Sequence, residues 1–339
     1  MPNQNILKWV KKNLFNNWYN SLLTVVCIWL LISTITNILN WIFNQAQWSV
    51  IQANLSLFLV GRYPTELYWR LWLVLAIILS LSVISWAIFT QRISSRFNTF
   101  LPVAWALSFP LVLWLIGGGL GLQPVDTNLW NGLLLTLVTA VISIVLSFPL
   151  GVLLALGRQS KLFVIKNFSI LYIEIVRGLP LIGILFLAQV MLPLFLPIEF
   201  RLDRVIRGIA GLTLFSAAYL AENVRGGLQS IPHGQYEAAK ALALNTPLMM
   251  LLIILPQALR AVIPALVGQF IGLFKDTSLL SIVGLLELTG ISRSILAQPQ
   301  FLNRYAEVYL FVGLLYWVFC YAMSLASRRL EKQLGIGKR

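Results

Sequence analysis

The sequence contains few charged residues, one histidine and two cysteines. Only 11% of its 339 residues are charged, with 11 acidic residues against 25 lysines and arginines. About a quarter of the residues of a soluble domain are charged, so this composition excludes an ordinary soluble protein. His233 and the few acids argue against a metal centre or general-base chemistry. Cys27 and Cys320 lie in apolar runs far apart, and we expect two small core residues rather than a disulfide or a metal pair.

Apolar residues make up 59% of the chain, and the mean hydropathy is +0.84. Runs of about 20 apolar residues recur, each long enough to cross a hydrocarbon core of ~30 Å. Backbone polar groups in lipid must be paired within a helix or a closed barrel, and the short alternating strands typical of a barrel do not occur here. The sequence therefore predicts an all-α polytopic membrane protein.

The apolar runs predict eight membrane spans with both chain ends on the cytoplasmic side. They are expected at about residues 22–43, 69–89, 100–121, 129–157, 170–196, 208–228, 256–274 and 305–326. Pro180 and Pro193 predict a kinked or broken fifth span. The apolar segment 279–288 is too short to cross the membrane, and we interpret it as re-entrant. We divide the chain into an N-terminal extension with three spans (1–124), a core (125–330) and a basic tail (331–339).

The formal net charge of +14 is compatible with nucleic-acid binding or with basic cytoplasmic loops. The second interpretation is better, because the basic residues cluster beside the predicted spans, where cytoplasmic lysine and arginine orient helices and contact anionic lipid. The clusters contain Lys8, Lys11, Lys12, Arg92, Arg96, Arg158, Lys161, Lys166, Arg328, Arg329, Lys332, Lys338 and Arg339. We therefore expect membrane lipid, and no nucleic acid, as a partner.

One polar, helix-prone loop, at about 229–256, interrupts the apolar runs. Ser230 and Pro232 are helix-start signals, residues 235–244 are rich in strong helix formers, and Asn245-Thr246-Pro247 ends the run. A helix of about three turns at a membrane surface could be a docking element for a partner or a plain connector. The spacing alone favours the connector.

A few ionisable groups lie within or beside the apolar runs. Glu174 and Arg177, like Glu222 and Arg225, belong to an E-x-V-R-G pattern that places both charges on one helical face. Such a pair is either a structural clamp, which we favour slightly, or part of a substrate pathway. The cluster Lys275-Asp276-Thr277-Ser278 is either a helix cap and turn or a site for the carboxylate and ammonium groups of an amino acid.

The polar loop resembles a known motif. Glu237-Ala238-Ala239, followed by a run that ends in Ile254-Leu255-Pro256, is similar to the EAA loop of ABC-importer membrane subunits. In that family the loop forms coupling helices that sit in a cleft of the ATP-hydrolysing subunit. The family usually has glycine four positions after the second alanine, where this chain has Ala243. Because alanine continues a helix that glycine would loosen, we expect the helix to continue here, and the bend between the two coupling helices is left open.

Three further motifs resemble the polar amino-acid branch of these permeases, which includes histidine, glutamine, arginine and general L-amino-acid systems. In chain order they are Tyr172-x-Glu174-x-x-Arg177-Gly178-x-Pro180-Leu181, Tyr219-x-x-Glu222-x-x-Arg225-Gly226-Gly227 and Lys275-Asp276-Thr277-Ser278-Leu279. The resemblance covers about 129–330. The three additional N-terminal spans are similar to those of the longer general L-amino-acid permeases.

The resemblance implies a type I importer with a five-helix core in each of two permease subunits, the second being the same or a related chain. It also implies ATPase subunits docked on the coupling helices and an extracytoplasmic binding protein that delivers the amino-acid substrate. The expected ATPase-coupling residues are Gly234, Gln235, Tyr236, Glu237, Ala238, Ala239, Lys240 and Ala243. The expected substrate-pathway residues are Glu174, Arg177, Tyr219, Glu222, Lys275, Asp276, Thr277 and Ser278.

The chain lacks a phosphate-binding loop of the type G-x-x-x-x-G-K-S/T, to which its tail, Gly335-Ile336-Gly337-Lys338-Arg339, is only superficially similar. We therefore expect a non-catalytic subunit of the bacterial inner membrane that binds no cofactor, with ATP and Mg²⁺ used by a partner ATPase. The alternative is a stand-alone ion-coupled secondary transporter or channel. Secondary transporters usually have inverted halves with paired broken helices, and the sequence shows no such halves.

Overall fold

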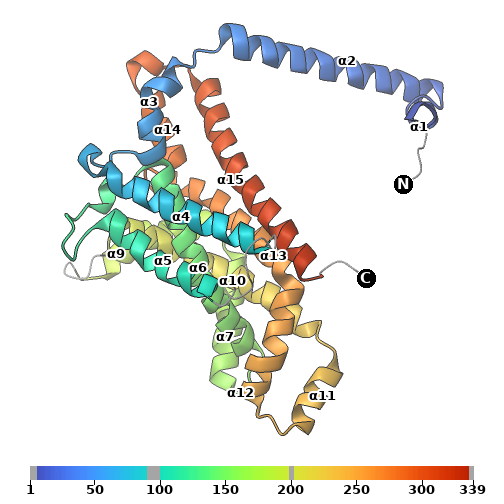
Figure 1. Ribbon diagram of the computed structural model, residues 1–339, viewed down its shortest axis with the longest axis vertical. Coiled ribbons are helices and arrows are strands. Elements are labelled where there is room, and N and C mark those ends of the chain that lie inside the picture. The colour runs from blue at the N-terminus through green and yellow to red at the C-terminus, as the bar shows by residue number, and fades with distance from the viewer. Residues whose placement is uncertain (1–5, 90–99, 198–201, 336–339) are drawn as a thin grey trace. The chain divides into compact units, whose positions relative to one another are not determined.

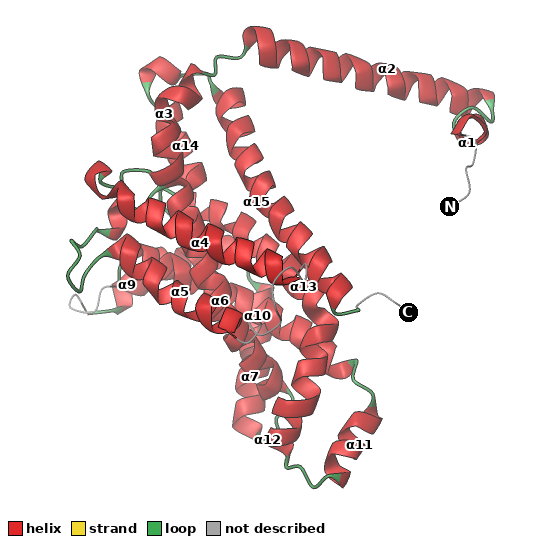
Figure 2. Ribbon diagram, in the orientation of Figure 1, coloured by secondary structure: helices red, strands yellow, loops and turns green. Residues whose placement is uncertain are grey.

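The computed structural model describes residues 6–89, 100–197 and 202–335, and these residues form helices joined by loops (Figures 1 and 2). The α-helices are α1 (Ile6–Asn13), α2 (Trp18–Asn40), α3 (Ser49–Val60), α4 (Tyr68–Phe89), α5 (Phe100–Gly117), α6 (Gly132–Arg158), α7 (Phe163–Gly178), α8 (Leu181–Phe186), α9 (Leu192–Phe195), α10 (Arg204–Gln229), α11 (His233–Ala241), α12 (Thr246–Met249), α13 (Leu255–Asp276), α14 (Leu288–Leu296) and α15 (Tyr305–Gln333). The predicted all-α fold is confirmed.

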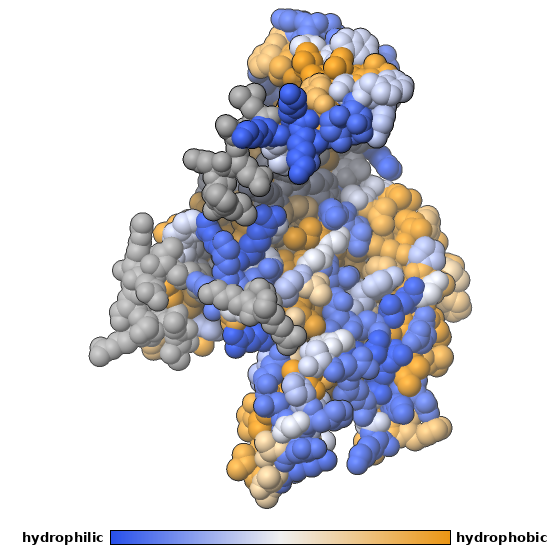
Figure 3. All heavy atoms as spheres, turned by 90° about the vertical axis from the view of Figure 1, so that its right-hand side faces the viewer, coloured by the Kyte–Doolittle hydropathy of each residue, from blue (hydrophilic) through white to orange (hydrophobic). Residues whose placement is uncertain are grey.

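Within the described residues, seven helices are long and apolar enough to cross a membrane. An eighth span is counted if α7 and the segment Leu181–Phe195, which are bent by 106° relative to each other, are taken together. This bend confirms the predicted break at Pro180. Leu179 is extended (φ −100°, ψ 142°) because the residue before a proline avoids the helical conformation. Broad hydrophobic patches on the surface are consistent with helices that face lipid (Figure 3).

The chain divides into two compact units, Met1–Ala53 and Asn54–Arg339. In the first unit, α2 has no buried side chain and Cys27 is exposed, so the expected core position of Cys27 is wrong. Cys320 is half-buried in the second unit. The two compact units separate near residue 53, and α4 and α5 belong to the same unit as all later helices. The domain boundary near residue 124 remains a prediction.

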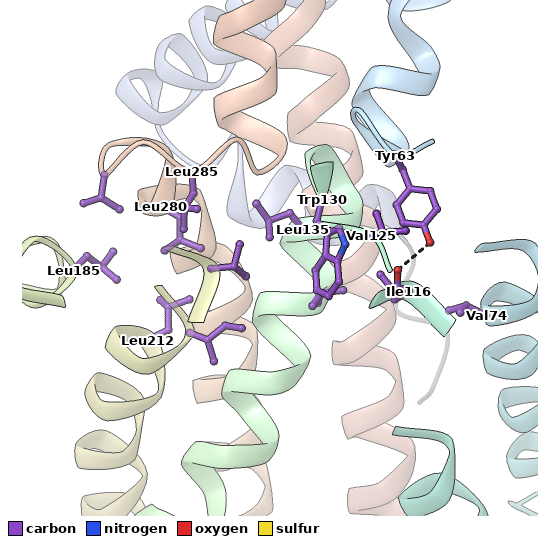
Figure 4. Close-up of a cluster of buried hydrophobic side chains, with 14 of the residues drawn as sticks. Tyr63, Val74, Ile116, Val125, Trp130, Leu135, Leu185, Leu212, Leu280 and Leu285 are labelled. Carbon is purple, nitrogen blue, oxygen red and sulfur yellow. Dashed lines mark hydrogen bonds between the residues drawn. The ribbon is translucent and has the colours of Figure 1, made fainter. Parts of the chain in front are cut away.

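The main hydrophobic core of the second unit joins the predicted extension to the predicted core (Figure 4). Tyr63, which precedes α4, is buried and donates a hydrogen bond to the backbone oxygen of Ile116 at 2.9 Å. The buried Arg70 donates to the backbone oxygen of Gln123 at 2.7 Å. Tyr63 and Ile116 share one cluster with Trp130 and with residues of α6, α8 and α10. The segments on either side of residue 124 are therefore packed as one body.

Two segments near α13 differ from expectation. The span predicted to begin near Pro256 is part of a continuous helical segment, Thr246–Ser281, which includes a π-helical turn at Met250–Ile254. The segment 279–288 begins within the 3₁₀ turn Thr277–Ser281 and ends at Leu288, the first residue of α14. Hydropathy did not predict the helix α14. Leu280 and Leu288 are both fully buried, so this short apolar segment packs against protein.

Gly132 lies at the junction of three segments at the start of α6. Its φ is +61°, and its N–H donates to the backbone oxygen of Leu286 at 2.8 Å. A Cβ at this position would lie 2.4 Å from the backbone oxygen of Phe58 at the end of α3. Both the left-handed backbone and the close approach of two chain segments therefore require glycine here.

We predict that Gly132→Ala lowers the free energy of unfolding by about 3 kcal/mol, because conformational strain adds to a clash with backbone that cannot move aside. Gly119→Ala is the matched control. Gly119 also has a left-handed φ, +86°, but a Cβ there meets no described atom within 4 Å, so only the conformational cost of about 1 kcal/mol applies. Thermal unfolding in detergent measures both variants. Equal losses would contradict a steric role for Gly132.

Candidate coupling helix and charged cluster

The helix α11 projects from the end of α10 and is followed by the long segment that contains α13 (Figure 1). Pro232 precedes its first residue with an extended ψ of 140°, as expected at a helix start. Three contacts hold α11 to the bundle: the buried Ala239 packs in a cluster with Leu228 and Met249, the Tyr236 hydroxyl donates to the backbone oxygen of Leu228 at 3.4 Å, and Gln235 accepts a hydrogen bond from Gln257 at 3.1 Å. Burial raises the pKa of the Tyr236 phenol above its ordinary value, in keeping with a protonated hydroxyl that donates.

The eight predicted coupling residues divide into two sets. Ala239 is buried and Tyr236 is half-buried, and these two residues attach α11 to the rest of the chain together with exposed Gln235, which bonds Gln257. The other six are exposed: Gly234, Gln235, Glu237, Ala238, Lys240 and Ala243. The outer face of α11 therefore presents one acid, one base and small residues that a partner could contact.

The expectation that the helix continues through Ala243 is wrong. The helix ends at Ala241, and Ala243 adopts the left-handed conformation with φ +55°. Leu244 N–H donates to Ala239 O at 3.2 Å and Ala243 N–H donates to Lys240 O at 2.9 Å, the hydrogen-bond pattern of a Schellman C-cap. Half-buried Leu244 packs in the same cluster as Ala239, and this burial fixes the turn despite the unfavourable residue. The bend that glycine makes in the family is present here with alanine.

We predict that Ala243→Gly stabilises the end of α11 by about 1 kcal/mol, because an L-residue at left-handed φ is strained and glycine is not. Ala241→Gly is the matched control, since it places glycine in the last helical turn and should destabilise α11 by about 1 kcal/mol. Amide hydrogen exchange of residues 233–244 measures both changes. Slower exchange in Ala241→Gly, or faster exchange in Ala243→Gly, would contradict the assigned cap.

A charged cluster joins α6, α7 and α10. Arg158, at the end of α6, contacts Glu174 at 2.9 Å and Glu222 at 3.0 Å. Glu222 also pairs with Arg225 at 2.7 Å and lies 3.6 Å from Arg177. Three arginines from three helices therefore surround one carboxylate, whose side chain is only 15% exposed.

The two E-x-V-R-G motifs behave differently. Glu222 and Arg225 pair within their own helix, as the spacing predicts. Glu174 pairs instead with Arg158, and Arg177 lies near Glu222 and 5.5 Å from the ring centroid of Tyr219. The motifs are thus brought together into one network, in which four of the predicted pathway residues meet. The sequence places Arg158 only in a basic cluster. Its position at the end of an apolar run is the signal that could have indicated its place in this network of charges.

We predict that Glu222→Gln lowers the free energy of unfolding by about 2 kcal/mol, because it leaves three mutually repelling guanidinium groups without their shared carboxylate. Glu174→Gln is the matched control: that side chain is 56% exposed and contacts one arginine, so its loss should cost less than about 1 kcal/mol. Thermal unfolding in detergent ranks the two variants. A larger loss for Glu174→Gln would contradict the central position of Glu222.

The remaining pathway residues lie elsewhere. Lys275 and Asp276 end α13, and the helical segment continues as the 3₁₀ turn Thr277–Ser281, so the predicted break is a change of helix type within a continuous segment. Phe274 contacts Tyr316 near the middle of α15, with ring centroids 5.3 Å apart. Ala258 lies beside Gly227 of α10, and Lys275 is roughly 25 Å further along α13 at 1.5 Å per residue. Lys275, Asp276, Thr277 and Ser278 are therefore not brought together with the charged cluster.

Sequence reasoning missed a second buried acid, Glu287. It is fully buried, and its carboxylate accepts hydrogen bonds from the N–H groups of Thr289 (2.8 Å) and Gly290 (2.9 Å), which caps α14. The Tyr316 hydroxyl donates to the same carboxylate at 3.1 Å. A lone acid in an otherwise apolar stretch is the signal that could have found it. Glu287 fixes the loop after Ser278 against α15.

Comparison with known proteins identifies the family. Residues 147–336 match the model of the binding-protein-dependent transport system inner membrane component family. The chain is 43% identical to the inner membrane amino-acid ABC transporter permease protein YhdY of Escherichia coli K12, over 97% of this chain and 93% of that protein. It is 35% identical to the glutamate/glutamine/aspartate/asparagine transport system permease protein BztC of Rhodobacter capsulatus, with the same shares of each chain.

A solved structure gives the same result for the fold. The structure described as an amino acid ABC transporter with histidines is similar to this chain with a TM-score of 0.54 and 30% identity, covering 60% of this chain and 92% of that one. The family match covers more than half of the chain, and the similarity to the two full-length relatives extends over nearly all of it. The chain belongs to the family of inner membrane components of binding-protein-dependent transport systems.

Proposed function

We propose that this chain is the permease subunit of an ATP-driven ABC importer that takes up amino acids delivered by a binding protein. The observation that carries the proposal is α11, a short helix with an exposed outer face that is attached to both α10 and α13. Its sequence carries the EAA motif, and the relatives that match nearly the full chain are named amino-acid transport permeases. Family membership supports this proposal over the alternative of a stand-alone secondary transporter or channel.

In the proposed function α11 docks on an ATPase subunit, and ATP and Mg²⁺ are bound there and not by this chain. Exposed Glu237 and Lys240 contact the ATPase, while Ala239 and Tyr236 transmit movement to α10 and α13. The end of the bundle that carries α11 then faces the cytoplasm. The end of α15 lies on the same side, since Arg260 near the start of α13 donates a hydrogen bond to the backbone oxygen of Leu334.

The substrate pathway is proposed to pass the break after α13. Lys275 is exposed and Asp276 half-exposed, next to the aromatic contacts near the middle of α15, where an amino acid could meet one charge of each sign. The charged cluster around Glu222 is nearer to α11. Its internal pairing favours a structural clamp that holds α6, α7 and α10 together beside the coupling helix.

A second permease subunit is proposed to pack on α13. Small residues recur along one face of this helix, namely Ala261, Ala265, Gly268 and Gly272. Gly268 and Gly272 are four residues apart, and a Cβ at either would meet no described atom within 4 Å, so neither glycine packs closely against another helix within the described chain. Small residues let helix backbones approach closely in membranes, which supports contact with another subunit at this face.

We predict that Glu237→Lys lowers ATP-driven amino-acid uptake at least tenfold, because reversal of an exposed charge at a docking contact costs more than about 1.4 kcal/mol. The variant should fold and insert normally, since Glu237 is exposed. The measurement is uptake by proteoliposomes that contain the chain, its ATPase and its binding protein, together with ATPase binding in detergent.

Glu66→Lys is the control, because Glu66 is an exposed acid in the turn before α4 and makes the same change of charge away from α11. Full uptake by Glu237→Lys would contradict the coupling role of α11. Uptake by the wild-type chain alone, driven by an ion gradient without ATP, would support the secondary transporter instead.

A further inference from the structure

A cavity of about 560 Å³ lies between α4, α5 and the C-terminal end of α15. Its lining includes Ser85 and Trp86 from α4, Trp105 from α5, and Arg329 and Lys332 from α15. All of these residues belong to the second compact unit. The volume is in the range of cavities that hold small organic ligands, about 300–1,000 Å³, and neither α11 nor the charged cluster contributes to it.

The cavity combines aromatic walls with a basic side. The Arg329 guanidinium carbon lies 3.9 Å from the ring centroid of Trp86, a cation–π contact that holds the positive charge against the wall. Lys332 is three residues further along α15 and so faces the same side. The Trp105 indole N–H donates to the Ser85 hydroxyl at 3.1 Å, which joins α4 to α5. A ligand with a negative head and an apolar body fits this arrangement.

The position of the cavity suggests the source of such a ligand. It lies at the end of α15 that contacts the start of α13 through Arg260 and Leu334, and therefore at the end of the bundle that carries α11. Exposed apolar residues such as Val83 and Leu107 continue the surfaces of α4 and α5 beside it. Tryptophans and basic residues together are typical of the membrane interface, and basic pockets between helices on the cytoplasmic side bind anionic lipid headgroups.

We propose that this cavity binds the phosphate headgroup of one anionic phospholipid, with its acyl chains against α4 and α5. Arg329 and Lys332 bind the phosphate, while Trp86 and Trp105 contact the glycerol and the first methylenes. Glu331, the acid in the same turn of α15, accepts a hydrogen bond from Ser327 at 2.6 Å and is not among the described residues that line the cavity. The assignment of this lipid to the cytoplasmic leaflet rests on the proposed function, because it depends on the side that α11 faces. The rest of the proposal does not.

The test is native mass spectrometry of the full chain in detergent, titrated with dioleoylphosphatidylglycerol or dioleoylphosphatidylcholine. We expect one phosphatidylglycerol to be retained in preference to phosphatidylcholine. Arg329→Gln should weaken its binding about fivefold, as expected from the loss of one basic contact. Arg328→Gln is the matched control: it removes the same charge from the preceding exposed position, which does not line the cavity, and should weaken binding much less than Arg329→Gln does.

Several outcomes would overturn the proposal: equal binding by Arg329→Gln and Arg328→Gln, equal retention of phosphatidylcholine, or displacement of the lipid by millimolar inorganic phosphate, which would indicate a site for a free anion. Lys332→Gln provides a second variant if Arg329→Gln unfolds at a lower temperature than Arg328→Gln. Because the measurement needs neither ATP nor a partner subunit, its result is independent of whether the chain transports amino acids.

Discussion

The close packing of α10 against its neighbours is the constraint on which the rest of the structure depends. A Cβ at Gly151 of α6 would lie 2.7 Å from the Cβ of Leu220, and one at Gly227 would lie 2.6 Å from the backbone oxygen of Ala258 in α13. Without a hydrophobic driving force between helices in lipid, association depends on such close backbone approach. These contacts bring α6 and α13 against α10. They place Arg158 beside Glu222, and they fix the two ends of the loop that carries α11.

The attachment of α11 depends on the same packing. Because Leu228 and Met249 meet in one cluster with Ala239, the helix is held by both chain segments that enter and leave it. The continuous helical segment Thr246–Ser281 then runs from α11 to and past the polar end of α13 at Lys275 and Asp276. In the proposed function a displacement of α11 is transmitted along this segment. Its π-helical turn and Pro264 are the positions where the helix can bend, since each interrupts the regular hydrogen-bond ladder.

Hydropathy predicted the membrane spans well, because the requirement for about 20 apolar residues is a property of a local segment. The proline break at Pro180 and the helix end at Asp276 are also local, and both were predicted. Arg158 and Glu222 could not be paired from the sequence, because their contact depends on how α6 packs against α10. The helical spacing predicted a Glu174–Arg177 pair. Glu174 pairs instead with Arg158 of α6, and Arg177 lies near Glu222 of α10. Cys27 was wrongly placed in a core because apolar runs in membrane proteins also face outward.

Ala243 shows how tertiary packing overrides residue preference. Helix propensity favours continuation through this alanine, and the cost of a left-handed alanine is about 1–2 kcal/mol. Continuation would instead carry Leu244 around the helix and away from the cluster that contains Ala239 and Met249. A continued helix would pair Ala239 O with Ala243 N–H and Lys240 O with Leu244 N–H instead, so backbone hydrogen bonding does not decide between the two conformations. Full burial of a leucine contributes about 1.5–3 kcal/mol, so half-buried Leu244 contributes about 1 kcal/mol, which is comparable to the strain. The burial of Leu244 therefore favours the turn at Ala243. The EAA motif of the family is recognisable in this chain although alanine replaces its usual glycine.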